Sequence, residues 1–116
     1  MYNNIINNTW KNSKYIKSNS WKLEKWNLEL VEDDHESYLG SCDFIEHKIT
    51  IYSCNNRDNN ELMVTLAHEV AHAIYGKMGH TNEWLNLFQK IALDFGVSKL
   101  NLLKWTLIYK GRYNLF

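Results

Sequence analysis

The segment spanning residues 61–75 constrains this chain most, because its pattern predicts a helix that is buried on almost every side. The segment is rich in Leu, Ala, Met and Glu, and Gly76 follows where a helix would end. Projected at 100° per residue, its apolar side chains spread over an arc of about 220°. The remaining arc of about 100° holds a polar stripe made of Glu61, Thr65, His68, Glu69 and His72.

The polar stripe contains the pattern H-E-x-x-H, formed by His68, Glu69 and His72. Two histidines four residues apart lie about one turn apart on one helix face, so both imidazoles can reach one ion. Glu69 then lies beside the ion, where it can take a proton from a bound water without being a ligand. The alternative is a pair of exposed histidines on an ordinary amphipathic helix. The wide apolar arc argues against that alternative, so we predict a metal site.

A catalytic zinc ion takes three protein ligands and keeps a fourth position open. His80 is the first candidate for the third ligand, because the glycines at 76 and 79 allow the chain to reverse after the helix. Its alternative role is that of a loop histidine or a helix cap. Glu83 is the fallback ligand, unless it is simply an acidic residue in the first turn of the next helix. His35 and His47 are further candidates, although both lie in connectors and suit plain surface histidines.

The rest of the chain predicts an α+β fold, because strands come first and helices follow. Alternation over residues 26–31 predicts a half-buried strand, and residues 38–44 and 48–53 flank a turn as in a hairpin. A helix is predicted over 82–95, with Thr81 as its cap. Residues 98–109 suit a short third helix with Leu100, Leu103 and Leu107 on one face. We therefore expect a small antiparallel three-stranded sheet packed on the motif helix and on one or two further helices.

Composition excludes several classes of protein. With 116 residues, 45% of them apolar, the chain suits one globular domain and not a disordered tail. Two cysteines without a C-x-x-C pattern provide neither a zinc ribbon nor a disulfide scaffold. No apolar run approaches the roughly 18 residues that span a bilayer, and the first residues lack the layout of a signal peptide. We expect an intracellular protein, cytoplasmic or beside nucleic acid in a nucleoid or nucleus, that is not secreted and does not bind membranes.

The charges cancel overall, at 13 basic and 13 acidic residues, but they are arranged in blocks. Residues 1–28 carry a net +4, residues 29–46 a net −7 and residues 97–116 a net +4. The first block and the residues beside it interleave bases with aromatics, as surfaces that bind single-stranded DNA do. The simpler interpretation is a solvated lysine face with buried aromatics. The set comprises Trp10, Lys11, Lys14, Tyr15, Lys17, Trp21, Lys22, Lys25 and Trp26.

Residues 21–96 resemble the SprT-like (Spartan-type) zinc metallopeptidases. The resemblance rests on the three-strand run, on Gly40-Ser41-Cys42 ahead of Ile49-Thr50-Ile51, and on the phrase from Thr65 to Ala73. It also rests on Gly79-His80-Thr81-Asn82-Glu83-Trp84, where the family typically has G-H-G-P-E-F. Thr81 and Asn82 depart from that pattern. The spaced G-H-x-x-E with its aromatic is more specific than H-E-x-x-H, which many zincins share.

The resemblance implies a zincin-like fold and a zinc metalloendopeptidase. Zn²⁺ would be held by His68, His72 and His80, with Glu69 as the catalytic residue that assists attack by a zinc-bound water. The substrate would be an unfolded or flexible polypeptide, such as a DNA-associated protein, lying extended along the sheet edge near residues 38–52. Residues 1–20 would form an arm or weak helix, 21–96 the peptidase core and 97–116 a C-terminal helix or extension. Tyr75, Tyr109 and Tyr113 are candidates for stabilising the oxyanion, although each also suits an ordinary aromatic.

The competing hypothesis is a zinc-stabilised module that binds protein or nucleic acid with little catalysis. Glu69 discriminates between the two, because a purely structural site has no use for a carboxylate beside the open position.

Overall fold

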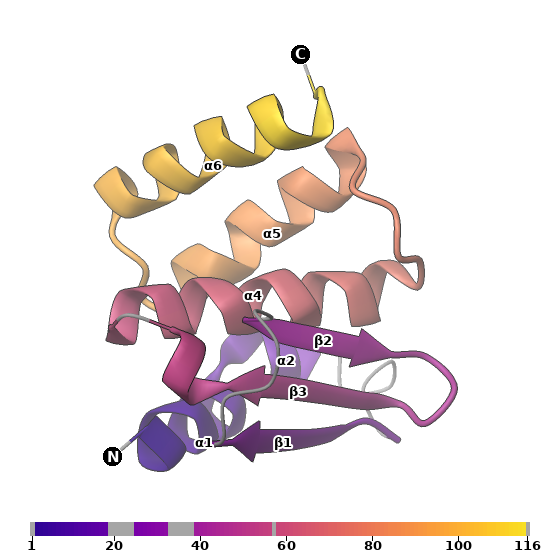
Figure 1. Cartoon of the computed structure of the whole chain (residues 1–116), viewed down its shortest axis with the longest axis vertical. Coiled ribbons are helices and arrows are strands. Elements are labelled where there is room, and N and C mark those ends of the chain that lie inside the picture. Colours follow the sequence, from indigo (N-terminus) through magenta and orange to yellow (C-terminus); the bar gives the residue numbers. More distant parts are fainter. Residues whose placement is uncertain (1, 19–24, 33–38, 57, 116) are drawn as a thin grey trace.

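The computed structural model describes residues 2–18, 25–32, 39–56 and 58–115. Its described part is α+β, as predicted: along the chain, helices come before and after the three strands of a small sheet (Figure 1). In chain order the elements are α1 (Tyr2–Asn12), α2 (Lys14–Ser18), β1 (Asn27–Val31), β2 (Gly40–Asp43), β3 (Lys48–Tyr52), the 3₁₀ turn η1 (Ser53–Asn55), α4 (Asn59–Tyr75), α5 (Asn82–Asp94) and α6 (Lys99–Tyr113).

The three-stranded sheet is mixed, so the predicted all-antiparallel sheet is wrong in part. The strand order is β1-β3-β2, with β2 and β3 antiparallel as in the predicted hairpin, but β1 and β3 parallel. The physical reason lies in β3, where Ile49, Thr50 and Ile51 are all buried. A strand buried on both faces belongs at the centre, so β3 lies between its hairpin partner and β1. Asn27 and Glu29 on β1 are exposed, as suits an edge strand.

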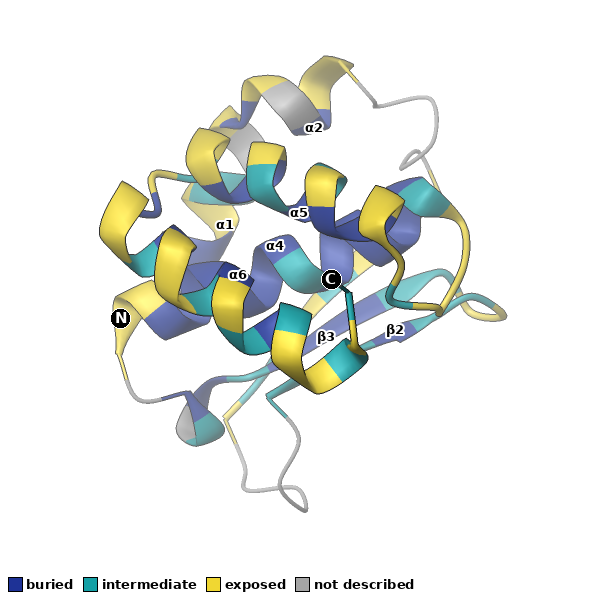
Figure 2. Cartoon of the chain, turned by 90° about the horizontal axis from the view of Figure 1, so that it is seen from above, coloured by how far each residue is buried: buried dark blue, intermediate teal, exposed yellow. Residues whose placement is uncertain are grey.

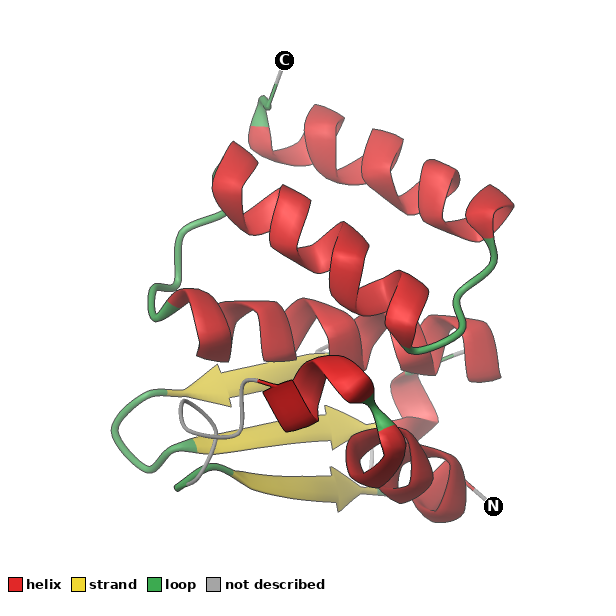
Figure 3. Ribbon diagram, turned by 180° about the vertical axis from the view of Figure 1, so that it is seen from behind, coloured by secondary structure: helices red, strands yellow, loops and turns green. Residues whose placement is uncertain are grey.

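Helix α4 is the buried helix that the apolar pattern predicts. Its first turn is capped by the Asp58 carboxylate, which accepts a hydrogen bond from the Glu61 N–H at 2.9 Å. It ends at Gly76, whose φ of +82° is a left-handed conformation that favours glycine. Thirteen of its residues are buried. Figures 1 and 3 show why, because α4 lies between the sheet and α5.

Helices α5 and α6 form further layers above α4 (Figure 3). Side chains of Thr81 and Ser98 cap α5 and α6, accepting from the N–H groups of Trp84 and Asn101 at 3.2 Å in each case. The third predicted helix is longer than expected, since α6 reaches Tyr113. No helix among the described residues is both long enough and apolar enough to cross a membrane.

The face of α6 that carries most of its leucines is not its buried face. Leu100, Leu103 and Leu107 share one face as predicted, but they are 79%, 56% and 61% exposed. The buried face carries Leu102, Thr106 and Tyr109 instead. Figure 2 shows the outer turns of α6 facing solvent.

The N-terminal segment, predicted as an arm or weak helix, is helical in α1 and α2. Ile6 of α1 and Ile16 of α2 are buried in the common core. The Thr9 hydroxyl donates to the Met63 sulfur of α4 at 3.2 Å, and the Ser13 hydroxyl donates to the Asp94 carboxylate of α5. The two helices therefore pack on the same core as α4 and α5.

Candidate metal centre

Three histidines converge where α4 ends and the chain turns into α5. His68 and His72 lie one turn apart on α4, and His80 lies in the connection that follows. The Nε2 atom of His80 is 3.0 Å from Nε2 of His72 and 3.2 Å from Nε2 of His68. The three side chains could together hold a metal ion. The sequence places the same three residues in one ligand set.

The turn after α4 brings His80 back to the helix and also orients His72. The Nδ1 atom of His72 lies 3.0 Å from the Lys77 carbonyl oxygen. A carbonyl only accepts, so His72 donates its Nδ1–H and leaves the lone pair of Nε2 facing the other two imidazoles. An outer hydrogen bond of this kind is typical of metal-ligating histidines.

The spacing of the nitrogens suits a small divalent cation. Two imidazole ligands at about 2.05 Å from a tetrahedral zinc ion are about 3.3 Å apart. The contacts of 3.0 and 3.2 Å made by His80 are close to that value. A single N–H on His80 cannot point at both neighbouring nitrogens, whereas one central cation faces all three lone pairs. The residues present therefore fit a zinc ion.

The surroundings keep these histidines neutral, which is the form that binds metals. Burial, followed by the neighbouring histidines and Arg112, lowers the pKa of His68 to about 2. Burial, then His72 and Arg112, lowers the pKa of His80 to about 4. Burial also lowers the pKa of His72. At neutral pH the cluster therefore offers lone pairs, not charges.

An aromatic shell encloses the three imidazoles. Trp84 is fully buried, and its ring centroid lies 4.7 Å from that of His68, 5.2 Å from that of His72 and 4.8 Å from that of His80. Helix α6 completes the shell, because Tyr113 stacks on His80 with centroids 3.8 Å apart and planes 2° apart. The Tyr109 hydroxyl lies 3.2 Å from Nδ1 of His68, the second outer hydrogen bond of the cluster.

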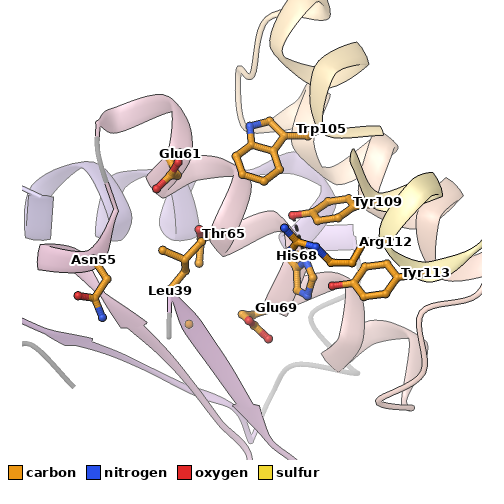
Figure 4. Close-up of a pocket in the computed structure, with 11 residues that line it drawn as sticks. Leu39, Asn55, Glu61, Thr65, His68, Glu69, Trp105, Tyr109, Arg112 and Tyr113 are labelled. Carbon is orange, nitrogen blue, oxygen red and sulfur yellow. Dashed lines mark hydrogen bonds between the residues drawn. The ribbon is translucent and has the colours of Figure 1, made fainter. Parts of the chain in front are cut away.

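A pocket of about 590 Å³ opens beside the cluster, bounded by α4, by the start of β2 and by α6 (Figure 4). Of the three histidines only His68 lines it, and Glu69 lies next to His68 in its wall. Glu69 is 7% exposed, and burial raises the pKa of its carboxyl group to about 8. His68 and a buried carboxylic acid therefore line the same space, which can hold a ligand.

Gly40 at the start of β2 allows the sheet to approach this part of α4. A Cβ atom at Gly40 would lie 2.9 Å from Cγ2 of Thr65, 3.0 Å from the Thr50 carbonyl oxygen and 3.3 Å from Cγ of Glu69. Only glycine leaves room for that contact. The Gly40-Ser41-Cys42 stretch, noted in the sequence for its resemblance, thus sets the position of the wall that holds Glu69.

The other candidate ligands that the structure describes, Glu83 and His47, lie outside the cluster. Glu83 is exposed in the first turn of α5, and His47 lies half-buried in the β2–β3 turn beside Trp26. His35 lies outside the described residues. Cys42 is a buried thiol whose pKa burial raises to about 12, as the sequence suggests for a cysteine in the core.

The described members of the basic and aromatic N-terminal set comprise exposed lysines and two tryptophans that pack against the core. Trp10 and Trp26 pack against the core, and Trp26 meets Phe44 edge-on at 5.4 Å. Lys14, Lys17 and Lys25 are exposed. Trp21 and Lys22 lie outside the described residues. The described tryptophans thus have structural neighbours of their own.

Sequence reasoning missed the contribution of α6. The sequence suggests Tyr109 and Tyr113 only as oxyanion donors or ordinary aromatics, and Arg112 only as part of the basic block over residues 97–116. Yet Tyr109, Arg112 and Tyr113 all line the pocket. Their spacing of three and four residues places them on one helix face, which was the one signal available.

In comparisons with known proteins, no family model, no curated protein and no solved structure matches the chain.

Proposed function

We propose that this chain is a zinc-dependent metallopeptidase of the SprT-like type, with a zincin-like fold, that hydrolyses peptide bonds of unfolded or flexible proteins. One observation carries the proposal: His68, a member of the converging histidine cluster, and Glu69 line the same pocket. A structural metal site needs the histidines but neither the pocket nor the buried carboxylate.

Zinc is the metal proposed for the cluster. Imidazole also suits copper, iron and nickel, so the donor atoms alone do not select it. Three neutral imidazoles beside an open pocket and a glutamate are typical of catalytic zinc. When bound, Zn²⁺ supplies a Lewis acid that polarises a carbonyl and makes water a stronger acid.

Glu69 is proposed as the general base and then the general acid. Its carboxylate takes a proton from the water whose oxygen bonds to the carbonyl carbon, and it later gives that proton to the amine nitrogen as the C–N bond breaks. Burial alone favours the neutral acid, whereas a nearby divalent cation favours the carboxylate. These opposing effects suit a group that must both accept and release a proton.

Strand β2 is the proposed binding edge for an extended substrate. In the described sheet β3 is central, so β2 has one edge without a strand partner. Gly40, in the first position of β2, and Leu39 before it both line the pocket. A polypeptide that adds to this edge forms main-chain hydrogen bonds, which favours unfolded segments over folded ones.

The test compares wild-type protein with Glu69→Gln for zinc content and for cleavage of an unfolded protein. We expect one zinc per chain in both, and cleavage lower by about 10²- to 10⁴-fold in the variant, because the proton carrier is lost. DNA is included in one arm, since DNA-associated proteins are candidate substrates. A wild type that holds one zinc and cleaves nothing, with or without DNA, would instead support a zinc-stabilised binding module.

A further inference from the structure

Arg112 is the permanent cation of the pocket. Among the described residues that line it, the others are apolar, neutral, acidic or the neutral His68. Figure 4 shows the Arg112 side chain between the rings of Tyr109 and Tyr113, pointing toward His68.

The positive charge of Arg112 in this pocket suits the binding of an anionic group. No carboxylate among the described residues forms an ion pair with Arg112. A guanidinium beside a site that fits a divalent cation repels that cation. The Arg112 charge has a role if a negatively charged group binds or forms in the pocket during the reaction.

We propose that Arg112 binds the oxyanion that forms on the scissile carbonyl oxygen, an inference that rests on the proposed peptidase function. When the water oxygen bonds to the carbonyl carbon, the π electron pair of the C=O bond moves onto the oxygen. Arg112 donates N–H groups to that oxygen, and the pair returns to the C=O bond as the C–N bond breaks. Because a guanidinium stays protonated, no proton has to move at this position.

The two tyrosines beside Arg112 position the helix turn that carries it. The Tyr109 hydroxyl is hydrogen-bonded to Nδ1 of His68, and the Tyr113 ring is stacked on His80. These two contacts fix the turn of α6 that carries Arg112 against the cluster. The helix turn that carries the exposed Arg112 is thus in place before the substrate arrives, and preorganised donors stabilise an oxyanion most effectively.

The experiment uses the full zinc-loaded chain and three variants: Arg112→Gln, Arg112→Lys and the control Lys104→Gln. Lys104 lies on the same helix, is exposed and does not line the pocket. Zinc content and thermal unfolding are measured first, so that a misfolded variant is recognised. The readouts are kcat and KM for a peptide with an amidated C-terminus and for the same peptide with a free carboxylate. A further readout is the Kd of a phosphinic peptide, whose tetrahedral anion imitates the oxyanion.

For Arg112→Gln we expect kcat to fall about 10²-fold on both peptides, with KM within about threefold of wild type. The phosphinic peptide should bind more weakly by a similar factor. The kcat of Arg112→Lys should lie between those of wild type and Arg112→Gln, because lysine keeps the positive charge but lacks the planar guanidinium that donates two parallel hydrogen bonds. Lys104→Gln should match wild type in every readout.

Two results would overturn the proposal. One is an unchanged kcat and an unchanged phosphinic-peptide Kd in Arg112→Gln. The other is a KM that rises only for the peptide with the free carboxylate, which would mean that Arg112 binds the substrate carboxylate and not the oxyanion. If the wild type cleaves nothing, the peptidase proposal fails by itself. The phosphinic-peptide titration then still decides whether Arg112 binds an anion of this shape.

Discussion

Helices α4 and α6 both contribute to the candidate site, but they do so from opposite surroundings. α4 is buried on most sides, between the sheet and α5. α6 has one face against the cluster and one face in solvent, and its exposed face carries Leu100, Leu103 and Leu107. In α4 the polar residues are the exception and mark the site. In α6 three of the leucines lie outside, and the site residues that line the pocket are Tyr109, Tyr113 and the exposed Arg112.

The difference shows when a sequence pattern can locate a site. A helix that must be buried everywhere tolerates polar side chains only where they have a task, so its polar stripe points to chemistry. A surface helix carries polar residues for solubility as well, so a functional arginine does not stand out. The comparison can be tested by substitutions on each helix.

The largest expected effect comes from His72→Ala on α4. His72 is 1% exposed, provides one of the converging Nε2 atoms and donates to the Lys77 carbonyl. Its loss should reduce bound zinc from one per chain to a trace and abolish cleavage. Affinity should fall by more than the 10- to 100-fold that an outer-shell substitution costs. Metal analysis after gel filtration measures it. His47→Ala, which lies outside the cluster, is the control and should keep its zinc.

The inner and outer faces of α6 are compared by Leu102→Ala and Leu103→Ala. Leu102 is buried, and its truncation should lower the free energy of unfolding by about 2 kcal/mol or more. Leu103 is exposed, and its truncation should change the free energy of unfolding by less than about 0.5 kcal/mol. Urea unfolding curves give both values. Equal losses would mean that the leucine-rich face of α6 is also covered in solution.

Gly40→Ala tests how closely the sheet must approach α4. The added Cβ would come within 2.9 Å of Thr65 and 3.3 Å of Glu69, so the wall has to move. We expect the free energy of unfolding to fall by about 1 to 3 kcal/mol. Cleavage should fall as well, because Glu69 shifts. The matched control is Gly79→Ala, where a Cβ meets nothing within 4 Å. A variant as stable and active as the control would show that the contact is not needed.

A prediction about metal affinity alone concerns Tyr109→Phe on α6. The substitution removes the hydroxyl beside Nδ1 of His68 and keeps the packed ring. Zinc affinity, measured by competition with a chelating dye, should fall by about 10- to 100-fold. Tyr75→Phe removes a hydroxyl that accepts a hydrogen bond from Thr81, away from the cluster, and should leave the affinity unchanged. Equal affinity in both variants would limit the metal centre to α4 and the connection after it.

The sequence predicts what depends on local rules. The end of α4 at Gly76 and the start of α5 after Thr81 follow from capping roles that are visible in the chain itself. The ligand set follows from the helical spacing of His68 and His72 and from the glycines before His80. The zinc, the reaction and the substrate remain proposals.

The sequence could not predict what depends on how distant segments meet. The parallel pairing of β1 with β3 joins residues such as Leu28 and Ile49, and no local pattern determines it. The inward face of α6 carries Leu102, Thr106 and Tyr109, which packs against Trp84, and not the exposed Leu100, Leu103 and Leu107. Arg112 became a candidate only once its helix lay over the pocket.

The most direct test of the central claim is X-ray absorption spectroscopy at the zinc edge of the stoichiometrically loaded protein. The account predicts three imidazole nitrogens at about 2.0 to 2.1 Å, with a light, non-protein atom completing the coordination. That result would leave an open position toward Glu69 and α6. A fourth protein ligand, or the absence of stoichiometric zinc binding, would contradict the account.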